Sequence, residues 1–75
     1  MNKFPSKETV ELVRSQYPKG TRVALVRMSD PYSRLQPGDQ GTVNHVDDIA
    51  TIFVNWDNGE GLGLAFGEDS CRKIV

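Results

Sequence analysis

Short apolar segments in which every second residue is polar run through most of this chain, a pattern of half-buried strands rather than of long helices. The clearest of them covers 49–56. Ile52, Val54 and Trp56 fall on one face of such a strand, and Phe53 adds apolar surface to the other face. A strand with apolar residues on both faces is typical of the interior of a sheet, so we expect this segment to be central.

Four more strands are predicted by the same alternation and by enrichment in β-branched residues, at 21–28, 41–46, 60–66 and 71–75. Turn residues separate them, and the Asp-Asn-Gly at 57–59 is typical of a hairpin turn. Five short strands joined by glycine-bearing turns predict a mainly β fold, a small five-stranded SH3-like barrel that is partly open.

A short α-helix is predicted before the barrel, at 6–16. Ser6 is suited to cap its N-terminus, and acidic residues fill the first turns, where the helix dipole favours them. Val10, Val13 and Tyr17 form one apolar stripe. Such a stripe more often packs on the domain's own sheet than on a partner, so we expect the first of these arrangements.

The length of 75 residues indicates a single domain over 1–75, with the barrel at 21–75. A chain this short builds one small core but no deep catalytic cleft. The single histidine, His45, has no serine, cysteine or second carboxylate placed by local spacing to complete a catalytic set. We therefore expect a protein that is not an enzyme and that uses no cofactor.

Cysteine content and hydropathy restrict the compartment and the kind of site. Cys71 is the only cysteine, so no internal disulfide forms, and the chain has no Cys/His cluster to hold zinc. No segment approaches the roughly 20 apolar residues of a membrane span, and the start lacks the apolar run of a signal peptide. We expect a cytoplasmic protein with no metal site and no membrane contact.

Charge is distributed unevenly along the chain, although the net charge is only -1. Residues 1–36 hold seven Lys or Arg against three acidic residues, whereas 37–71 hold seven acidic residues and no Lys or Arg. Two explanations stay open. Acidic residues fill the hairpin turns, or the folded surface is polarised and steers a partner or pairs with another copy.

Candidate binding residues are concentrated in the longest loop, 29–39, and in the 57–59 turn, because loops of small barrels commonly carry binding residues. Tyr32 and Trp56 are the aromatic residues from which a barrel would build a platform for an extended or proline-rich peptide. For Trp56 a core position is the commoner alternative. The candidate set for a protein partner is Asp30, Tyr32, Arg34, Trp56, Asp57 and Asn58.

Binding of nucleic acid or a nucleotide is the alternative function. Arg22, Arg27 and Arg34 would form a basic surface, with Tyr32 as a stacking ring. The excess of acidic residues in 37–71 argues against strong non-specific binding to phosphates. A third hypothesis is a homodimer, because glycines in 60–66 leave a strand edge that another chain can approach closely.

Five short motifs resemble those of one family. They are Tyr17-Pro-Lys-Gly-Thr-Arg-Val23, Asp30-Pro-Tyr32, Pro37-Gly38 with Gly41-Thr-Val43, Val54-Asn-Trp-Asp-Asn-Gly59, and Asp69-Ser70. The chain resembles an uncharacterised family of small domains from phages and other mobile elements of Gram-positive bacteria. The Gly-Thr-Val and Trp-Asp-Asn-Gly motifs are also similar to those of mind-bomb-type SH3-like domains.

The family resemblance implies a biological setting but no specific activity. Mobile elements encode many very small proteins that bind and inhibit host machinery, so it implies a binding module with a protein partner, for instance an inhibitor of a host defence system. The mind-bomb-type similarity supports the barrel. After the shared turn those domains continue with an aromatic residue and arginine, whereas this chain continues Glu60-Gly-Leu-Gly-Leu64, so their peptide site is not carried over.

Overall fold

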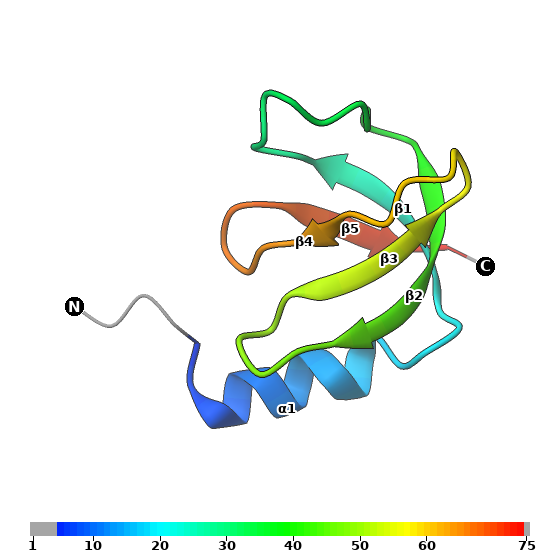
Figure 1. Ribbon diagram of the computed structural model, residues 1–75. Coiled ribbons are helices and arrows are strands. Elements are labelled where there is room, and N and C mark those ends of the chain that lie inside the picture. The colour runs from blue at the N-terminus through cyan, green and yellow to red at the C-terminus, as the bar shows by residue number, and fades with distance from the viewer. Residues whose placement is uncertain (1–4, 75) are drawn as a thin grey trace.

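The computed structural model describes residues 5–74, which form one helix and five strands (Figure 1). The elements are α1 (Lys7–Gln16), β1 (Arg22–Arg27), β2 (Gln40–Val46), β3 (Ile52–Trp56), β4 (Gly63–Leu64) and β5 (Ser70–Lys73). All strand pairs are antiparallel and belong to one open sheet. The predicted mainly β fold with a short N-terminal helix is therefore confirmed.

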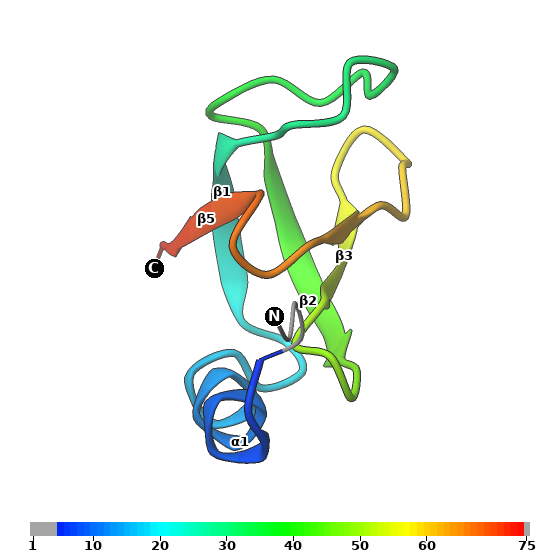
Figure 2. The same cartoon turned by 90° about the vertical axis from the view of Figure 1, so that its left-hand side faces the viewer.

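The strand order in the sheet is β4-β3-β2-β1-β5, so β4 and β5 are its two edges. In a flat sheet of five strands the edges would lie about 19 Å apart. Yet β4 and β5 are joined by the compact turn 65–69, in which the backbone N–H groups of Glu68 and Asp69 both donate to the Ala65 carbonyl, at 3.2 and 3.0 Å. The sheet must curl to bring its edges together, and Figure 2 shows it curled.

The core fills the concave side of this curled sheet. Alternation along β3 is as predicted, since Val54 and Trp56 are 1% and 3% exposed while Asn55 is exposed. As expected, β3 lies inside the sheet, between β2 and β4. The buried cluster consists of Val23, Leu25, Leu35, Val43, Val54, Trp56 and Leu64.

Helix α1 begins where its capping residue predicts. The Ser6 side-chain oxygen accepts a hydrogen bond from the backbone N–H of Thr9, at 3.2 Å, and so satisfies one of the free donors of the first turn. The apolar stripe divides along the helix. Val10 is buried, whereas Val13 and Tyr17 are only half-buried, so part of the stripe remains accessible.

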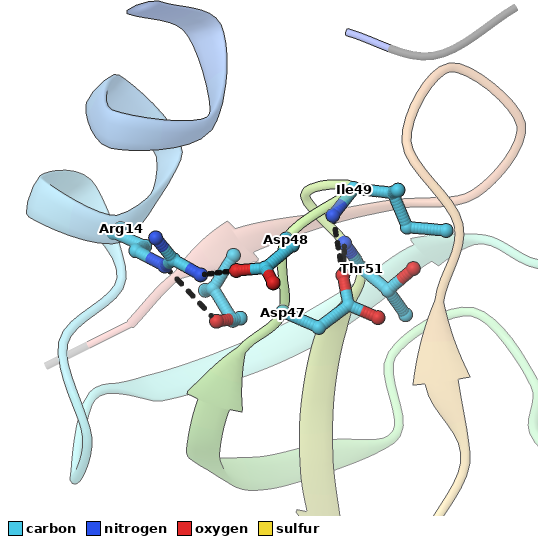
Figure 3. Close-up of polar contacts among 6 residues, drawn as sticks. Arg14, Asp47, Asp48, Ile49 and Thr51 are labelled. Carbon is cyan, nitrogen blue, oxygen red and sulfur yellow. Dashed lines mark hydrogen bonds and ion pairs between the residues drawn. The ribbon is translucent and has the colours of Figure 1, made fainter. Parts of the chain in front are cut away.

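Helix α1 packs on its own sheet and is fastened to the turn after β2 (Figure 3). Arg14 Nε donates to the Val46 carbonyl at 3.1 Å, and Arg14 Nη2 lies 2.7 Å from Asp48 Oδ1. The turn itself is held by Asp47, whose Oδ1 accepts the backbone N–H groups of Ile49 and Thr51 at 3.0 and 2.8 Å. One arginine therefore joins the helix to the backbone at the end of β2 and to a side chain of the turn that follows.

Two strands are shorter by three or more residues than the sequence pattern predicts. The segment predicted at 60–66 is reduced to Gly63–Leu64, because the preceding residues wrap around Trp56. The Glu60 carbonyl accepts the Trp56 backbone N–H at 2.8 Å, and the Leu62 carbonyl accepts the indole N–H at 2.9 Å. Similarly, the strand predicted from residue 49 begins at Ile52, because Ala50 adopts a positive φ of 62° in the preceding turn.

Candidate functional site

The loop that joins β1 to β2, residues 28–39, presents Tyr32 to solvent on a defined turn. The Asp30 side chain accepts the backbone N–H of Tyr32 at 2.9 Å, and the Asp30 carbonyl accepts that of Ser33 at 3.2 Å. Pro31 fixes one backbone angle between them. Tyr32 is 92% exposed. Its ring therefore projects from a backbone that is already ordered by Asp30.

Both the interior and the start of this loop are anchored. Leu35 is 6% exposed and belongs to the core cluster. Ser29 donates its backbone N–H and its hydroxyl to Asp69 Oδ1, both at 2.8 Å, and the backbone N–H of Ala65 donates to Asp69 Oδ2 at 2.9 Å. Burial opposes ionisation of Asp69, but these hydrogen bonds and the charge of Arg27 outweigh it and hold the pKa of Asp69 below its usual value.

The 57–59 turn is held by an ion pair with β1. Arg22 Nη1 and Nη2 donate to Asp57 Oδ1 and Oδ2 at 2.8 and 2.7 Å, a two-pronged geometry. The Arg22 guanidinium also reaches Thr42 Oγ1, at 3.0 Å. Hydrogen bonding from Arg22 holds the pKa of Asp57 below its usual value. Asn58 accepts the backbone N–H of Glu60 at 3.0 Å, so its side chain shapes the turn.

The predicted protein-binding residues are thus only partly brought together. The 28–39 loop with Asp30, Tyr32 and Arg34 and the 57–59 turn lie at the same end of the sheet (Figures 1 and 2). Trp56 lies beneath that end, in the core, with its indole N–H bonded to the Leu62 carbonyl. The structure therefore gives Trp56 the core position that the sequence left open, and its ring is not presented to a partner.

Two of the basic residues of the nucleic-acid alternative, Arg22 and Arg27, do not lie together. Arg22 is engaged by Asp57, and Arg22 and Arg27 stand at opposite ends of β1, roughly 16 Å apart along the strand. Arg34 and Tyr32 share the exposed 28–39 loop. Of the four residues, only these two are near neighbours in the chain and both free to face solvent.

Part of the uneven charge along the chain is used in ion pairs within the fold. Both ion pairs found within residues 5–74 join the basic first half to the acidic segment, Arg14 to Asp48 and Arg22 to Asp57, each at 2.7 Å. A polarised outer surface is therefore not needed to explain the pattern in these two turns.

An apolar groove of about 350 Å³ lies between α1, β3 and the segment that leads from β4 to β5. Phe66 at its margin is 49% exposed. The sequence reasoning missed this groove, because its walls come from five elements that are far apart in the chain and that include β1 with Arg27. No local pattern in the sequence indicates the groove, although Val13 and Tyr17 of the predicted helix stripe form part of one wall. The apolar and sulfur-bearing residues that line it are Val13, Tyr17, Ala50, Ile52, Leu64, Ala65, Phe66 and Cys71.

The thiol in this groove is not activated. Burial raises the pKa of Cys71, and a hydrogen bond with Tyr17 opposes that effect only in part. Burial also raises the pKa of the Tyr17 hydroxyl. Both groups are therefore neutral near pH 7, so the groove offers apolar contact and weak hydrogen bonds rather than a nucleophile. His45, elsewhere on the sheet, stacks on Phe53 with ring centroids 4.7 Å apart.

Residues 6–74 match the model of a family described as a domain of unknown function (DUF4314). The chain belongs to this family. No curated protein and no solved structure matches it significantly. The DUF4314 match spans α1 and all five strands, and so includes both the 28–39 loop and the groove. Within residues 5–74, no helix is long and apolar enough to cross a membrane.

Proposed function

We propose that this DUF4314 domain is a small non-enzymatic binding module that recognises a protein partner through the 28–39 loop, with Tyr32 as the central contact. The observation that carries the proposal is that Tyr32 is 92% exposed on a turn fixed by Asp30. Tyrosine is enriched among the residues that dominate binding energy, because it supplies a large contact area and loses little conformational freedom. An anchored loop lowers the entropic cost further.

Polar residues around Tyr32 complete the proposed surface. Arg34 is exposed on the same loop, and Asp57 and Asn58 are exposed at the same end of the sheet. A central aromatic ring within a polar rim is the usual anatomy of a protein interface. Trp56 supports this surface from the core and does not contact the partner.

The proposal extends to the fold type and the biological context. An SH3-like barrel is supported by the curled sheet, by the long loop between β1 and β2, and by the compact 65–69 turn before β5. The family resemblance in the sequence supports a cytoplasmic protein of a phage or mobile element in Gram-positive bacteria. Inhibition of host machinery, such as a defence system, is the specialised form of this role.

The decisive experiment is capture of partners from a lysate of the host, with the tagged protein, its Tyr32→Ala variant and a Leu12→Ala control. Leu12 is also exposed, at 57%, but lies on α1. A discrete protein that is retained by the wild type and the control, lost with Tyr32→Ala and resistant to nuclease would support the proposal. Equal capture by Tyr32→Ala would contradict it.

Two other results would replace the proposal with an alternative. Recovery of nucleic acid, or loss of the captured proteins after nuclease treatment, would favour nucleic-acid binding through Arg34 and Tyr32. Binding of that kind would weaken steeply with salt and with Arg34→Ala. A doubled mass in sedimentation, with no captured protein, would favour a homodimer.

A further inference from the structure

A second surface, which does not include Tyr32, combines an apolar groove with a free strand edge. The groove is lined by Leu64 at the end of β4 and by Ser70 and Cys71 at the start of β5, so it lies in the seam between the two edges of the sheet. Its volume of about 350 Å³ is at the lower end of the range for ligand sites, which is roughly 300–1,000 Å³. A few side chains of a partner would fill it.

The register of β5 shows which backbone groups face this seam. The Ile74 backbone N–H donates to the Arg22 carbonyl at 2.9 Å, and Arg72 is opposite Ala24. Alternate residues of an antiparallel strand turn their N–H and C=O groups to the same neighbour. The backbone N–H and C=O groups of Arg72 therefore face β1. Those of Cys71 and Lys73 face the opposite side of β5, on which the sheet has no further strand.

The side chains of Cys71 and Lys73 indicate which surface an added strand would contact. Cys71 lines the groove, and the Lys73 ammonium lies over the Tyr17 ring, 5.3 Å from its centroid, so both side chains lie on the α1 side. Residues directly opposite one another on paired strands share a face. A partner residue opposite Cys71 would thus place its side chain in the groove, against Val13 and Tyr17.

Charge on β5 selects among the strands that would fit. Arg72 and Lys73 are both exposed, and within residues 5–74 neither forms an ion pair. Pairing with β5 of a second copy would bring two cations from each strand together, which is unfavourable. The same charges favour a strand that carries carboxylates. Asp69, which lines the groove, is the opposing charge nearest along the chain, but it lies on the turn before β5 and its carboxylate accepts hydrogen bonds from Ser29 and Ala65.

We propose that the free edge of β5 binds an extended, acidic segment of a partner protein by strand addition, with an apolar side chain of that segment in the groove. The segment pairs with the backbone of Cys71 and Lys73, places an apolar residue opposite Cys71 and places a carboxylate opposite Arg72. Main-chain hydrogen bonds supply affinity, and the groove and the cations supply selectivity.

The test uses a synthetic peptide of about ten residues, acetylated and amidated, in which glutamate alternates with valine and phenylalanine, and a comparator with lysine in place of glutamate. NMR follows the amide hydrogen exchange of the whole protein during titration. We expect the acidic peptide to slow exchange at Cys71 and Lys73 by about tenfold or more without affecting Tyr32, and to bind at least about tenfold more tightly than the lysine peptide.

Two variants address the groove and the charge separately. Arg72→Glu, an exposed change, should reverse the preference between the two peptides, while the matched Arg34→Glu change on the 28–39 loop should leave it unaltered. Val13→Asp should weaken the acidic peptide by about tenfold, because it places a charge in the groove wall. If Val13→Asp does not fold, the Arg72→Glu comparison still decides.

Several outcomes would overturn the proposal. These are unchanged exchange at Cys71 and Lys73 with millimolar peptide, equal binding of the two peptides, or slowed exchange that depends on protein concentration alone, which would indicate a second copy. The proposed function is tested by a separate experiment. Tyr32→Ala should abolish partner capture but leave the peptide titration unchanged, so each result tests one surface.

Discussion

Gly41→Ala is the substitution for which the structure predicts the clearest loss of stability. Gly41 is buried in β2 opposite Trp56. A methyl group there would lie 2.6 Å from Val54 Cγ1, 2.9 Å from the Asn55 carbonyl oxygen and 3.0 Å from Trp56 Cα. Two of these three atoms belong to the backbone of β3 and cannot rotate away, so the two strands would have to separate.

The size of the effect follows from that crowding. Overpacking a well-packed interior typically destabilises a protein by about 1–3 kcal/mol. Because the added methyl group would contact backbone atoms, we expect Gly41→Ala to fall in the upper half of this range, at about 2–3 kcal/mol. A 75-residue domain has a free energy of unfolding of roughly 4–11 kcal/mol, so the loss is a large fraction of the total. We expect the melting temperature to fall by about 10–20 °C.

Urea unfolding followed by the fluorescence of Trp56, the only tryptophan, is a suitable assay. Gly61→Ala is the matched control, because a methyl group there has no atom within 4 Å and the backbone does not have a positive φ. The control should stay within about 0.5 kcal/mol of the wild type, on the stable side. If Gly41→Ala unfolds at the wild-type urea concentration with an unchanged slope, the reasoning about backbone contact is wrong.

Three further predictions concern the ion pairs and the thiol. The pKa of Asp57 is lower in the folded protein than in the unfolded chain, where it is about 3.9. The ionised Asp57 therefore stabilises the fold above the unfolded pKa, and this contribution is lost as the pH falls through the folded pKa. Between about pH 5 and pH 3 the wild type should lose more stability than Asp57→Asn, as measured by urea unfolding at each pH. Cys71 should react with iodoacetamide at pH 7.5 at least about tenfold more slowly in the native protein than in urea, since burial raises its pKa; equal rates, measured by mass spectrometry, would contradict this. Arg14→Ala should destabilise by about 1 kcal/mol and speed amide exchange in α1, whereas Asp48→Asn, which keeps the Arg14–Val46 hydrogen bond, should change the free energy of unfolding by less than about 0.5 kcal/mol.

Local signals in the sequence were sufficient for α1 and for the 52–56 part of the strand predicted at 49–56. The Ser6 cap depends on a residue three positions away, and the alternation of β3 depends on neighbours two positions apart. The strand predicted at 60–66 was too long, because its length is set by how the chain folds over the Trp56 ring. Such a tertiary contact does not change the periodicity of apolar residues in the sequence, so the pattern cannot indicate it.

The same distinction applies to the candidate site. The 28–39 loop and its exposed Tyr32 could be predicted, because turn residues and the absence of periodicity are local features. The ion pair between Arg22 and Asp57 could not be predicted, because these residues are 35 positions apart in the chain. The groove could not be predicted either, since its walls belong to α1 and to strands β1, β3, β4 and β5, which become neighbours only when the sheet curls.

Within the 28–39 loop, the residues that hold the loop and the residues that it displays are different. Leu35 and the Ser29–Asp69 hydrogen bonds fix its path, whereas Tyr32 and Arg34 project into solvent. Substitutions at these displayed positions therefore leave the core intact, as in the hypervariable loops of antibody domains. Under the proposed function, related sequences could diverge in target while they keep one scaffold, and a library randomised at these positions should yield folded binders with new specificities.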